Sequence, residues 1–205
     1  MARGAKMGQA EIRSLADLVH AAPGTERELY AAAEAVFWET ASTTCFGSAE
    51  ELLQFRRKYF DYYWEAAPDL FLLALTEAEG ATLDPPGPGA LGYVCAVADT
   101  REHPELSGLS DHLPLFADLY ERYPAHLHIN LTAASRGHGL GGRLIAALEE
   151  RLRARGATGL HLVTDPDARN VRFYRKKGFR DEVLRSLSLG EGGTSVPLLF
   201  MGTRL

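Results

Sequence analysis

Cysteine and long apolar runs are both scarce in this sequence. Its 205 residues include two cysteines, Cys45 and Cys95, with no Cys-x-x-Cys pair, which excludes a disulfide framework and a zinc ribbon. Apolar runs such as Leu70 to Leu75 are far shorter than the roughly 18 residues that a membrane-spanning helix needs. The amino-terminal residues are basic but no apolar segment comes after them, so no secretory signal is expected. We therefore expect a cytoplasmic protein without a membrane partner.

Positive charge is also in the minority. Lysine and arginine number 22 against 27 aspartates and glutamates, a net charge of −5, which argues against a nucleic-acid partner. One local exception is the stretch from Arg169 to Arg180, which carries six basic residues and no acid. Such a cluster is typical of a solvated helix face, and the alternative is contact with a phosphorylated ligand.

The first half of the chain has the patterns of helices and an antiparallel hairpin. Thr25 is a candidate helix N-cap, and Ser48 to Glu51 forms a capping box. Two runs rich in apolar and β-branched residues flank a Pro/Gly-rich turn at 84–89 and predict a hairpin. The expected elements are a strand at 11–15, helices at 25–38 and from 48 to about 64, and strands at 69–79 and 90–99.

The second half alternates strands and helices. Glycines at 156 and 178 are expected to end two helices, and Asp167 is expected to cap the second one. The expected elements are strands at 125–132 and 159–164, helices at 143–155 and from 167 to about 177, and a closing hairpin of strands 181–189 and 195–204. This order predicts a mixed α/β sheet in one domain.

A glycine-rich turn at 135–142 stands between the strand at 125–132 and the next helix. Free N–H groups at the positive end of a helix dipole bind phosphate oxygens, and glycines allow close approach. The spacing does not match a dinucleotide fingerprint or a P-loop. It matches Arg-x-x-Gly-x-Gly through Arg136, Gly139 and Gly141.

A second motif stands after one expected strand: Phe173-Tyr174-Arg175-Lys176-Lys177-Gly178-Phe179. With these two motifs in this order, the chain resembles the GNAT superfamily of N-acetyltransferases. The resemblance implies the GNAT fold, a mostly antiparallel sheet of six to seven strands flanked by helices. It implies one domain, with a helical part at 1–66 and a cofactor-binding core at 67–205. It also implies acetyl-CoA as cofactor and transfer of an acetyl group to an amine.

The same resemblance implies a set of cofactor-binding residues. A backbone amide near Ile129 or Leu131 polarises the thioester carbonyl, and Arg136 either reaches a phosphate or shapes the turn. Asn170 bonds to the pantetheine chain. The full expected set is Ile129, Leu131, Thr132, Arg136, Gly137, His138, Gly139, Leu140, Gly141, Gly142, Asn170, Phe173 and Tyr174.

Three residues are candidates for proton transfer. Tyr174 is expected to be the general acid, because a phenol with a pKa of ~10 can protonate a thiolate at small cost; the alternative is a ring that packs against CoA. The expected strand carries no glutamate as base, but His126 and His128 stand two residues apart on one face. Each is a candidate base, with a structural role or zinc binding as alternatives.

These motifs do not specify the acceptor substrate, and the expected classes are a small amine, an aminosugar or a protein lysine. As a partner, a second copy of the chain in a homodimer is left open. The long connection at 100–124 and the aromatic residues between Tyr59 and Trp64 either wall the acceptor site or belong to the core. Several segments also resemble the acetyltransferase-like C-terminal domain of O-GlcNAcases. That narrower resemblance implies an alternative function, a CoA-binding module with little or no catalytic activity.

Overall fold

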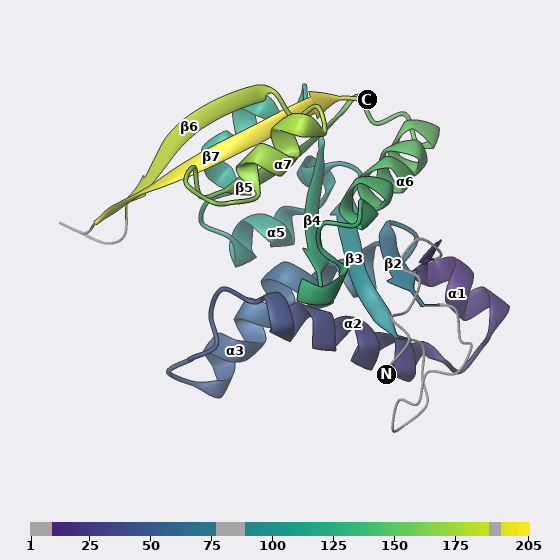
Figure 1. Cartoon of the computed structure of the whole chain (residues 1–205). Coiled ribbons are helices and arrows are strands. Elements are labelled where there is room, and N and C mark those ends of the chain that lie inside the picture. Colours follow the sequence, from purple (N-terminus) through teal and green to yellow (C-terminus); the bar gives the residue numbers. More distant parts are fainter. Residues whose placement is uncertain (1–9, 77–88, 189–193) are drawn as a thin grey trace. The chain divides into compact units, whose positions relative to one another are not determined.

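Seven strands form the central sheet in a computed structural model that describes residues 10–76, 89–188 and 194–205. They hydrogen-bond in the order β1-β2-β3-β4-β5-β7-β6 (Figure 1). The pairs β1–β2, β2–β3, β5–β7 and β6–β7 are antiparallel, and β4–β5 is parallel. The strands are β1 (Glu11–Ser14), β2 (Phe71–Leu75), β3 (Ala90–Val97), β4 (Ala125–Leu131), β5 (Gly159–Thr164), β6 (Asp181–Ser188) and β7 (Ser195–Arg204). The mixed α/β sheet expected from the sequence is therefore confirmed.

The chain divides into two compact units. One comprises Met1–Ala96 and His128–Leu148, and the other comprises Val97–Leu127 and Glu149–Leu205. Strand β4 and helix α6 (Leu140–Ala154) each contribute residues to both units. The single-domain organisation expected from the sequence stays a prediction.

In the first unit, β2 pairs with both β1 and β3, which confirms the expected hairpin and the short first strand. All five residues of β2 are buried, as expected for an apolar central strand. The hairpin's turn, expected at 84–89, lies almost wholly outside the described residues. Helices α1 (Leu15–Ala21) and α2 (Glu26–Thr40) precede β2. Thr25 occupies the N-cap position of α2, but its hydroxyl donates to the Ala22 carbonyl rather than capping the helix.

The helix expected from residue 48 contains a π-helical turn. It begins as α3 (Ala49–Arg56), continues through a π-helical segment at Arg57–Asp61 and ends as α4 (Tyr62–Ala66). Ser48 Oγ accepts from the Glu51 N–H at 3.1 Å, as a capping residue does, while the Glu51 carboxylate accepts from Gly47 instead of Ser48. The N–H of Tyr62 donates to the Arg57 carbonyl, five residues back, which identifies the π turn.

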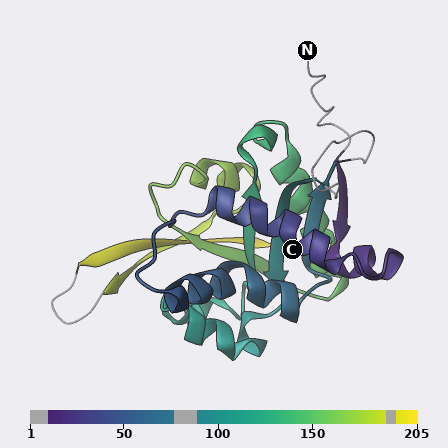
Figure 2. The ribbon, with the colours of Figure 1, turned by 90° about the horizontal axis from the view of Figure 1, so that it is seen from below.

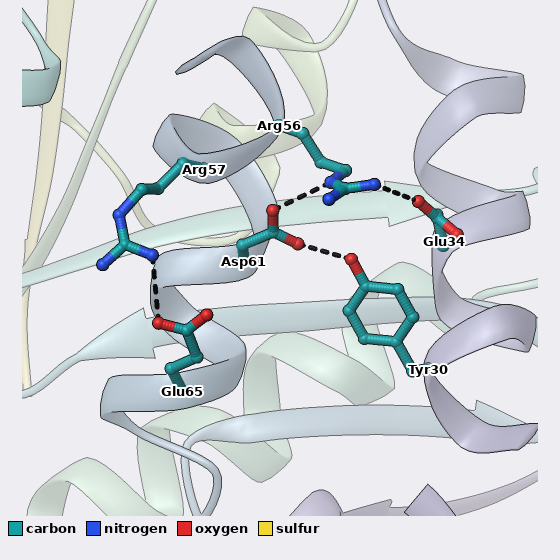
Figure 3. A network of polar contacts seen from close by, with 6 residues as sticks. All are labelled: Tyr30, Glu34, Arg56, Arg57, Asp61 and Glu65. Carbon is teal, nitrogen blue, oxygen red and sulfur yellow. Dashed lines mark hydrogen bonds and ion pairs between the residues drawn. The ribbon is translucent and has the colours of Figure 1, made fainter. Parts of the chain in front are cut away.

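A polar network connects this π turn to α2 (Figure 3). Arg56 donates to Asp61 and to Glu34, each at 2.8 Å, and Tyr30 donates to Asp61 at 2.6 Å. The π spacing brings Arg56 and Asp61 together although they are five residues apart. Burial, followed by the Asp61 carboxylate, raises the pKa of the Tyr30 phenol.

In the second unit, β7 is flanked by β5 and β6. The hairpin of β6 (yellow-green) and β7 (yellow) forms a long pair of ribbons in Figures 1 and 2. The turn of this hairpin, 189–193, lies outside the described residues. The long connection at 100–124 is largely helical. It contains the 3₁₀ helix Thr100–Glu102, helix α5 (Pro104–Leu109) and the 3₁₀ segment Pro114–Leu119. It folds because its apolar residues are buried, with Phe116, Tyr120 and Tyr123 packing in a cluster with Phe200.

Two helices begin at residues other than those expected. Helix α6 begins at Leu140 rather than Arg143. Gly141 and Gly142, which were expected in the turn, therefore lie within the first turn of the helix. Helix α7 (Val171–Lys176) has Asn170, not Asp167, at its N-cap position. Asp167 instead donates its N–H to the Asp165 carboxylate at 2.7 Å, which forms a local turn before the helix. Gly156 and Gly178 do stand after their helices with positive φ, as expected.

Candidate functional site

The end of β4 is held closely against β3 in the first unit. A Cβ added at Gly92 would lie 2.5 Å from Leu131 Cδ2 and 2.6 Å from the Asn130 carbonyl oxygen, so only glycine fits there. Asn130 Nδ2 donates to the Tyr93 hydroxyl at 2.6 Å. Burial raises the pKa of the Tyr93 phenol. These contacts fix the course of the strand on which Ile129 and Leu131 lie, both of them half-buried.

Directly after β4, the chain is anchored to the carbonyl of Leu91 in β3. Thr132 N–H donates to this oxygen at 3.0 Å and the buried Ser135 hydroxyl donates to it at 2.7 Å. Ser135 Oγ also accepts a hydrogen bond from the Thr132 hydroxyl and donates one to the Thr132 carbonyl. Thr132 holds the turn through its side chain and its N–H, and its expected role in cofactor binding stays a prediction.

The glycine-rich turn presents its backbone outward. Gly137 and Gly139 have φ values of 81° and 80°, and a Cβ built at either position meets nothing within 4 Å. Gly142 and Arg143 donate their N–H groups to Gly139. Among the residues that the structure describes, none accepts from the backbone N–H groups of 137–141, as is usual for the first turn of a helix. His138 is exposed, and Leu140 and Gly141 are buried at the start of α6.

This arrangement fits a phosphate-bearing cofactor. The open donors lie before and within the first turn of α6, a helix of 15 residues whose dipole favours an anion. Arg136 is exposed and its Nε donates to the Leu131 carbonyl at 3.1 Å. This contact suits the role of shaping the turn, and the alternative role of reaching a phosphate stays a prediction.

His128 lies among aromatic residues of the π turn and α4. Its ring centroid is 5.3 Å from that of Tyr59 and 5.2 Å from that of Tyr63, both edge-on. Tyr63 is buried, whereas His128 and Tyr59 are half-buried. Phe60 packs on the rings of β2 and β3. Of the aromatic residues at 59–64, Phe60 and Tyr63 are thus core residues, and Tyr59 is the more accessible neighbour of His128.

His126 lies in different surroundings, in the second unit. It is buried, and its ring centroid is 5.0 Å from that of His161, a residue that belongs to no motif in the sequence. His161 stacks between Tyr120 and Phe200 and its Nδ1 lies 2.7 Å from the Tyr123 carbonyl. Burial lowers the pKa of His161 to about 3. Its position in the middle of an apolar strand gave no signal of a site.

Tyr174 is buried in α7 of the second unit. Its ring centroid is 5.3 Å from that of Phe173 and 5.7 Å from that of Phe179. Burial raises the pKa of the phenol above its ordinary value. Asn170 is exposed, and the Thr164 hydroxyl donates to its Oδ1 at 3.5 Å.

Two charged side chains, one in the basic cluster at 169–180 and one in the connection at 100–124, are held in ion pairs. In the basic cluster at 169–180, Arg175 forms a two-fold ion pair with Glu182. Asp118 of the connection at 100–124 is paired in the same way with Arg185. Both pairs tie their elements to strand β6, which suits a structural role for these charges.

Metal ligands and membrane-spanning segments are not found among the described residues. Within 10–76, 89–188 and 194–205, no group of three or more His, Cys, Asp or Glu side chains is placed to hold a metal ion. In the same part of the chain, none of the helices is both long and apolar enough to span a bilayer. Cys45 is exposed and Cys95 is buried, and both are free thiols.

Solved structures with similar folds come from several acetyltransferases. The Drosophila melanogaster polyamine N-acetyltransferase has a TM-score of 0.61 at 16% identity, covering 96% of this chain and 100% of that one. A ribosomal-protein-alanine N-acetyltransferase from Brucella melitensis has a TM-score of 0.51 at 22% identity, covering 95% and 99%. The NatC complex bound to Gag peptide and CoA has a TM-score of 0.57 at 12% identity, covering 96% and 98%. At these identities the similarity shows the fold.

The family is shown by the sequence itself. A sequence model of the acetyltransferase (GNAT) family matches residues 35–179, well over half of the chain. The match includes β4, the glycine-rich turn and the Phe-Tyr motif of α7. The chain therefore belongs to the acetyltransferase (GNAT) family.

Proposed function

We propose that this protein is an acetyl-CoA-dependent N-acetyltransferase. The observation that carries the proposal is the row of backbone N–H groups at 137–141, which have no acceptor among the described residues and lie around the start of α6. Two of them belong to the positive-φ glycines Gly137 and Gly139. Such donors at a helix N-terminus suit a diphosphate. Membership of the acetyltransferase family supports the choice of CoA over other phosphate-bearing ligands.

Acetyl-CoA, when bound, supplies an activated acetyl thioester. In the turn from Arg136 to Gly142, the N–H groups of 137–141 donate to the diphosphate, since those of Arg136 and Gly142 already donate to Ala133 and Gly139. Backbone groups of Ile129 and Leu131 pair with the pantetheine chain as an added strand would, and an amide there donates to the thioester carbonyl. Asn170 and Phe173 are proposed to contact the pantetheine chain, Asn170 through its exposed amide.

Tyr174 is proposed as the proton donor to the departing thiolate. Because burial raises the pKa of its phenol, the hydroxyl stays protonated throughout the neutral pH range and is always able to donate. The same shift makes complete proton loss costly, so the phenol acts by sharing its proton with the sulfur in a hydrogen bond.

For the base, His128 is favoured over His126. His128 is half-buried beside Tyr59, so an amine can approach it, whereas His126 is enclosed beside His161. A neutral imidazole accepts a proton from an amine whose own pKa is lowered by removal from water.

The acceptor is proposed to be a small amine, an aminosugar or a protein lysine. The alternative function is a CoA-binding module without turnover. It depends on the narrower resemblance to the C-terminal domain of O-GlcNAcases, which rests on sequence segments alone. The two functions differ in one measurable respect, the release of free thiol.

Thiol release from acetyl-CoA across an amine library tests the proposal. Tyr174→Phe should lower kcat by about 100-fold, the range typical of a lost general acid, and leave CoA affinity within about twofold. Tyr62→Phe, another buried tyrosine, is the control. Tight CoA binding with background release in the wild type would leave only the binding module.

A second experiment tests the turn. Gly139→Asp places a side chain and a negative charge in the proposed cradle and should abolish measurable CoA binding in calorimetry. Gly24→Asp is the matched control, because Gly24 also has a positive φ and an open Cβ position. Equal CoA affinity of the two variants would remove the turn from the proposal.

A further inference from the structure

Glu39 holds the entry of the glycine-rich turn from a distant part of the sequence. Its Oε1 accepts a hydrogen bond from the Ala133 N–H at 2.6 Å, across 94 residues. Ala133 is the first residue of the 3₁₀ helix Ala133–Ser135, which stands just after β4. The first N–H groups of such a helix have no acceptor of their own, and Glu39 satisfies one of them.

The position of Glu39 is unusual for its helix. It lies in the last turn of α2, where no basic residue is present and where the helix dipole disfavours a negative charge. A local rule broken in this way is most often offset by a specific contact elsewhere. The contact with Ala133 is such an offset, and it lies beside the proposed cofactor turn.

The turn is thereby held on two sides at its start and left open at its centre. Leu91 of β3 accepts from Thr132 and Ser135, and Glu39 of α2 accepts from Ala133. The open N–H groups begin four residues after Ala133. A turn whose entry is fixed loses less conformational entropy when it binds an anion.

We infer that Glu39 is a positioning residue for the cofactor turn, acting through its hydrogen bond to the backbone of Ala133. This inference rests on the proposed function, because it assigns Glu39 a role toward the same CoA cradle. Glu39 acts as a hydrogen-bond acceptor rather than as a charge, since a negative charge close to a diphosphate would weaken its binding.

Two substitutions separate these properties. Glu39→Gln keeps an acceptor oxygen and removes the charge, whereas Glu39→Ala removes both. Calorimetry with CoA should give an affinity within about twofold of wild type for Glu39→Gln, or tighter. Glu39→Ala should bind CoA about 3- to 10-fold more weakly, as expected for loss of one hydrogen bond. Glu28→Ala, an exposed glutamate at the other end of α2, is the control and should be unchanged.

Two further readouts exclude a general effect on folding. Amide hydrogen exchange in the CoA-free protein should be faster at Ala133 in Glu39→Ala and restored in Glu39→Gln, while the melting temperature stays the same. In the thiol-release assay, KM for acetyl-CoA should rise in Glu39→Ala with kcat unchanged.

The inference is overturned if Glu39→Ala binds CoA as wild type does, or if Ala and Gln shift the affinity equally. If Gly139→Asp abolishes CoA binding and Glu39→Ala does not weaken it, this inference alone fails. If wild type and Gly139→Asp both lack CoA binding, the proposed function fails, and the role of Glu39 fails with it.

Discussion

The imidazole of His161 lies flat against the ring of Phe200, with centroids 4.9 Å apart and planes 17° from parallel. Its Nδ1 donates to the Tyr123 carbonyl, and its Nε2 has no hydrogen-bond partner among the described residues. His126 lies beside it, and burial, with a smaller contribution from the charge of His112, lowers the pKa of His161. At neutral pH this site therefore holds the neutral imidazole.

Stability should therefore fall in mild acid. The unfolded chain protonates His161 below about pH 6.5, whereas the folded protein does so only near its pKa of about 3. Protons are thus bound preferentially by the unfolded state between these values, which lowers the free energy of unfolding by up to ~1.4 kcal/mol per pH unit. Urea unfolding at pH 7, 6 and 5 measures this slope.

His161→Phe keeps the stacking on Phe200 and removes the titrating group, so its slope should be shallower over the same range. His20→Ala, an exposed histidine at the end of α1, should keep the wild-type slope. Identical slopes for His161→Phe and wild type would show that other groups carry the acid sensitivity.

Replacement of Gly92 by alanine should be severely destabilising. The added Cβ would lie 2.5 Å from Leu131 Cδ2 and 2.6 Å from a backbone oxygen, so β3 and β4 must separate. A loss of about 3 kcal/mol or more in the free energy of unfolding is expected in chemical denaturation. Gly108→Ala is the control: it meets nothing within 4 Å and lies in α5, so it should be neutral or stabilise by about 0.5–1 kcal/mol. Similar values for both would rule out close approach at Gly92.

Removal of Asp61 should cost more than removal of an exposed partner in the same helix. Asp61→Ala deletes the acceptor of both Tyr30 and Arg56 in the network of Figure 3, and about 2–3 kcal/mol of unfolding free energy should be lost. Glu65→Ala breaks only the exposed pair with Arg57 and should cost about 0–1 kcal/mol. In the Asp61→Ala background, Tyr30→Phe should add little, because the two effects share one bond. Additive losses would contradict the network.

The two thiols should differ sharply in reactivity. Cys45 is exposed, whereas Cys95 is buried and burial raises the pKa of its thiol. A chromogenic disulfide reagent at pH 8 should therefore label one thiol per native chain and two per chain in denaturant. Cys45→Ser should abolish native labelling, and rapid labelling that survives this substitution would mean that Cys95 is accessible.

Strong local signals made part of this structure predictable. The strand at 159–164, the Ser48 cap and both antiparallel hairpins were predicted from apolar runs and short-range hydrogen-bonding residues, which act over a few positions. The glycine turn and Tyr174 were found because their motifs are local too. Whether they act as proposed, and the expected cytoplasmic location, stay predictions.

Other features depend on contacts that no local pattern records. The start of α6 was missed by three residues, because glycines 141 and 142 have low helix propensity and the buried leucines later in α6 stabilise the helix that includes them. Asp167 and Asn170 are both plausible caps, and the Asp165 turn decides between them. Glu39 lies 94 residues from its partner, and His161 lies in an ordinary apolar strand, so neither could be recognised before the chain was folded.

The π turn at Arg57–Asp61 has a consequence for comparing this chain with its relatives. The hydrogen bond from Tyr62 to Arg57 spans one residue more than an α-helical bond. The side chains after the π turn are therefore shifted by one sequence position around the helix axis relative to those before it. A relative with an unbroken α-helix here should carry one residue fewer. An alignment of such a relative with this chain should contain a single gap between positions 57 and 61. Without that gap, the residues of the relative that correspond to either Phe55 or Tyr63 would be assigned wrongly.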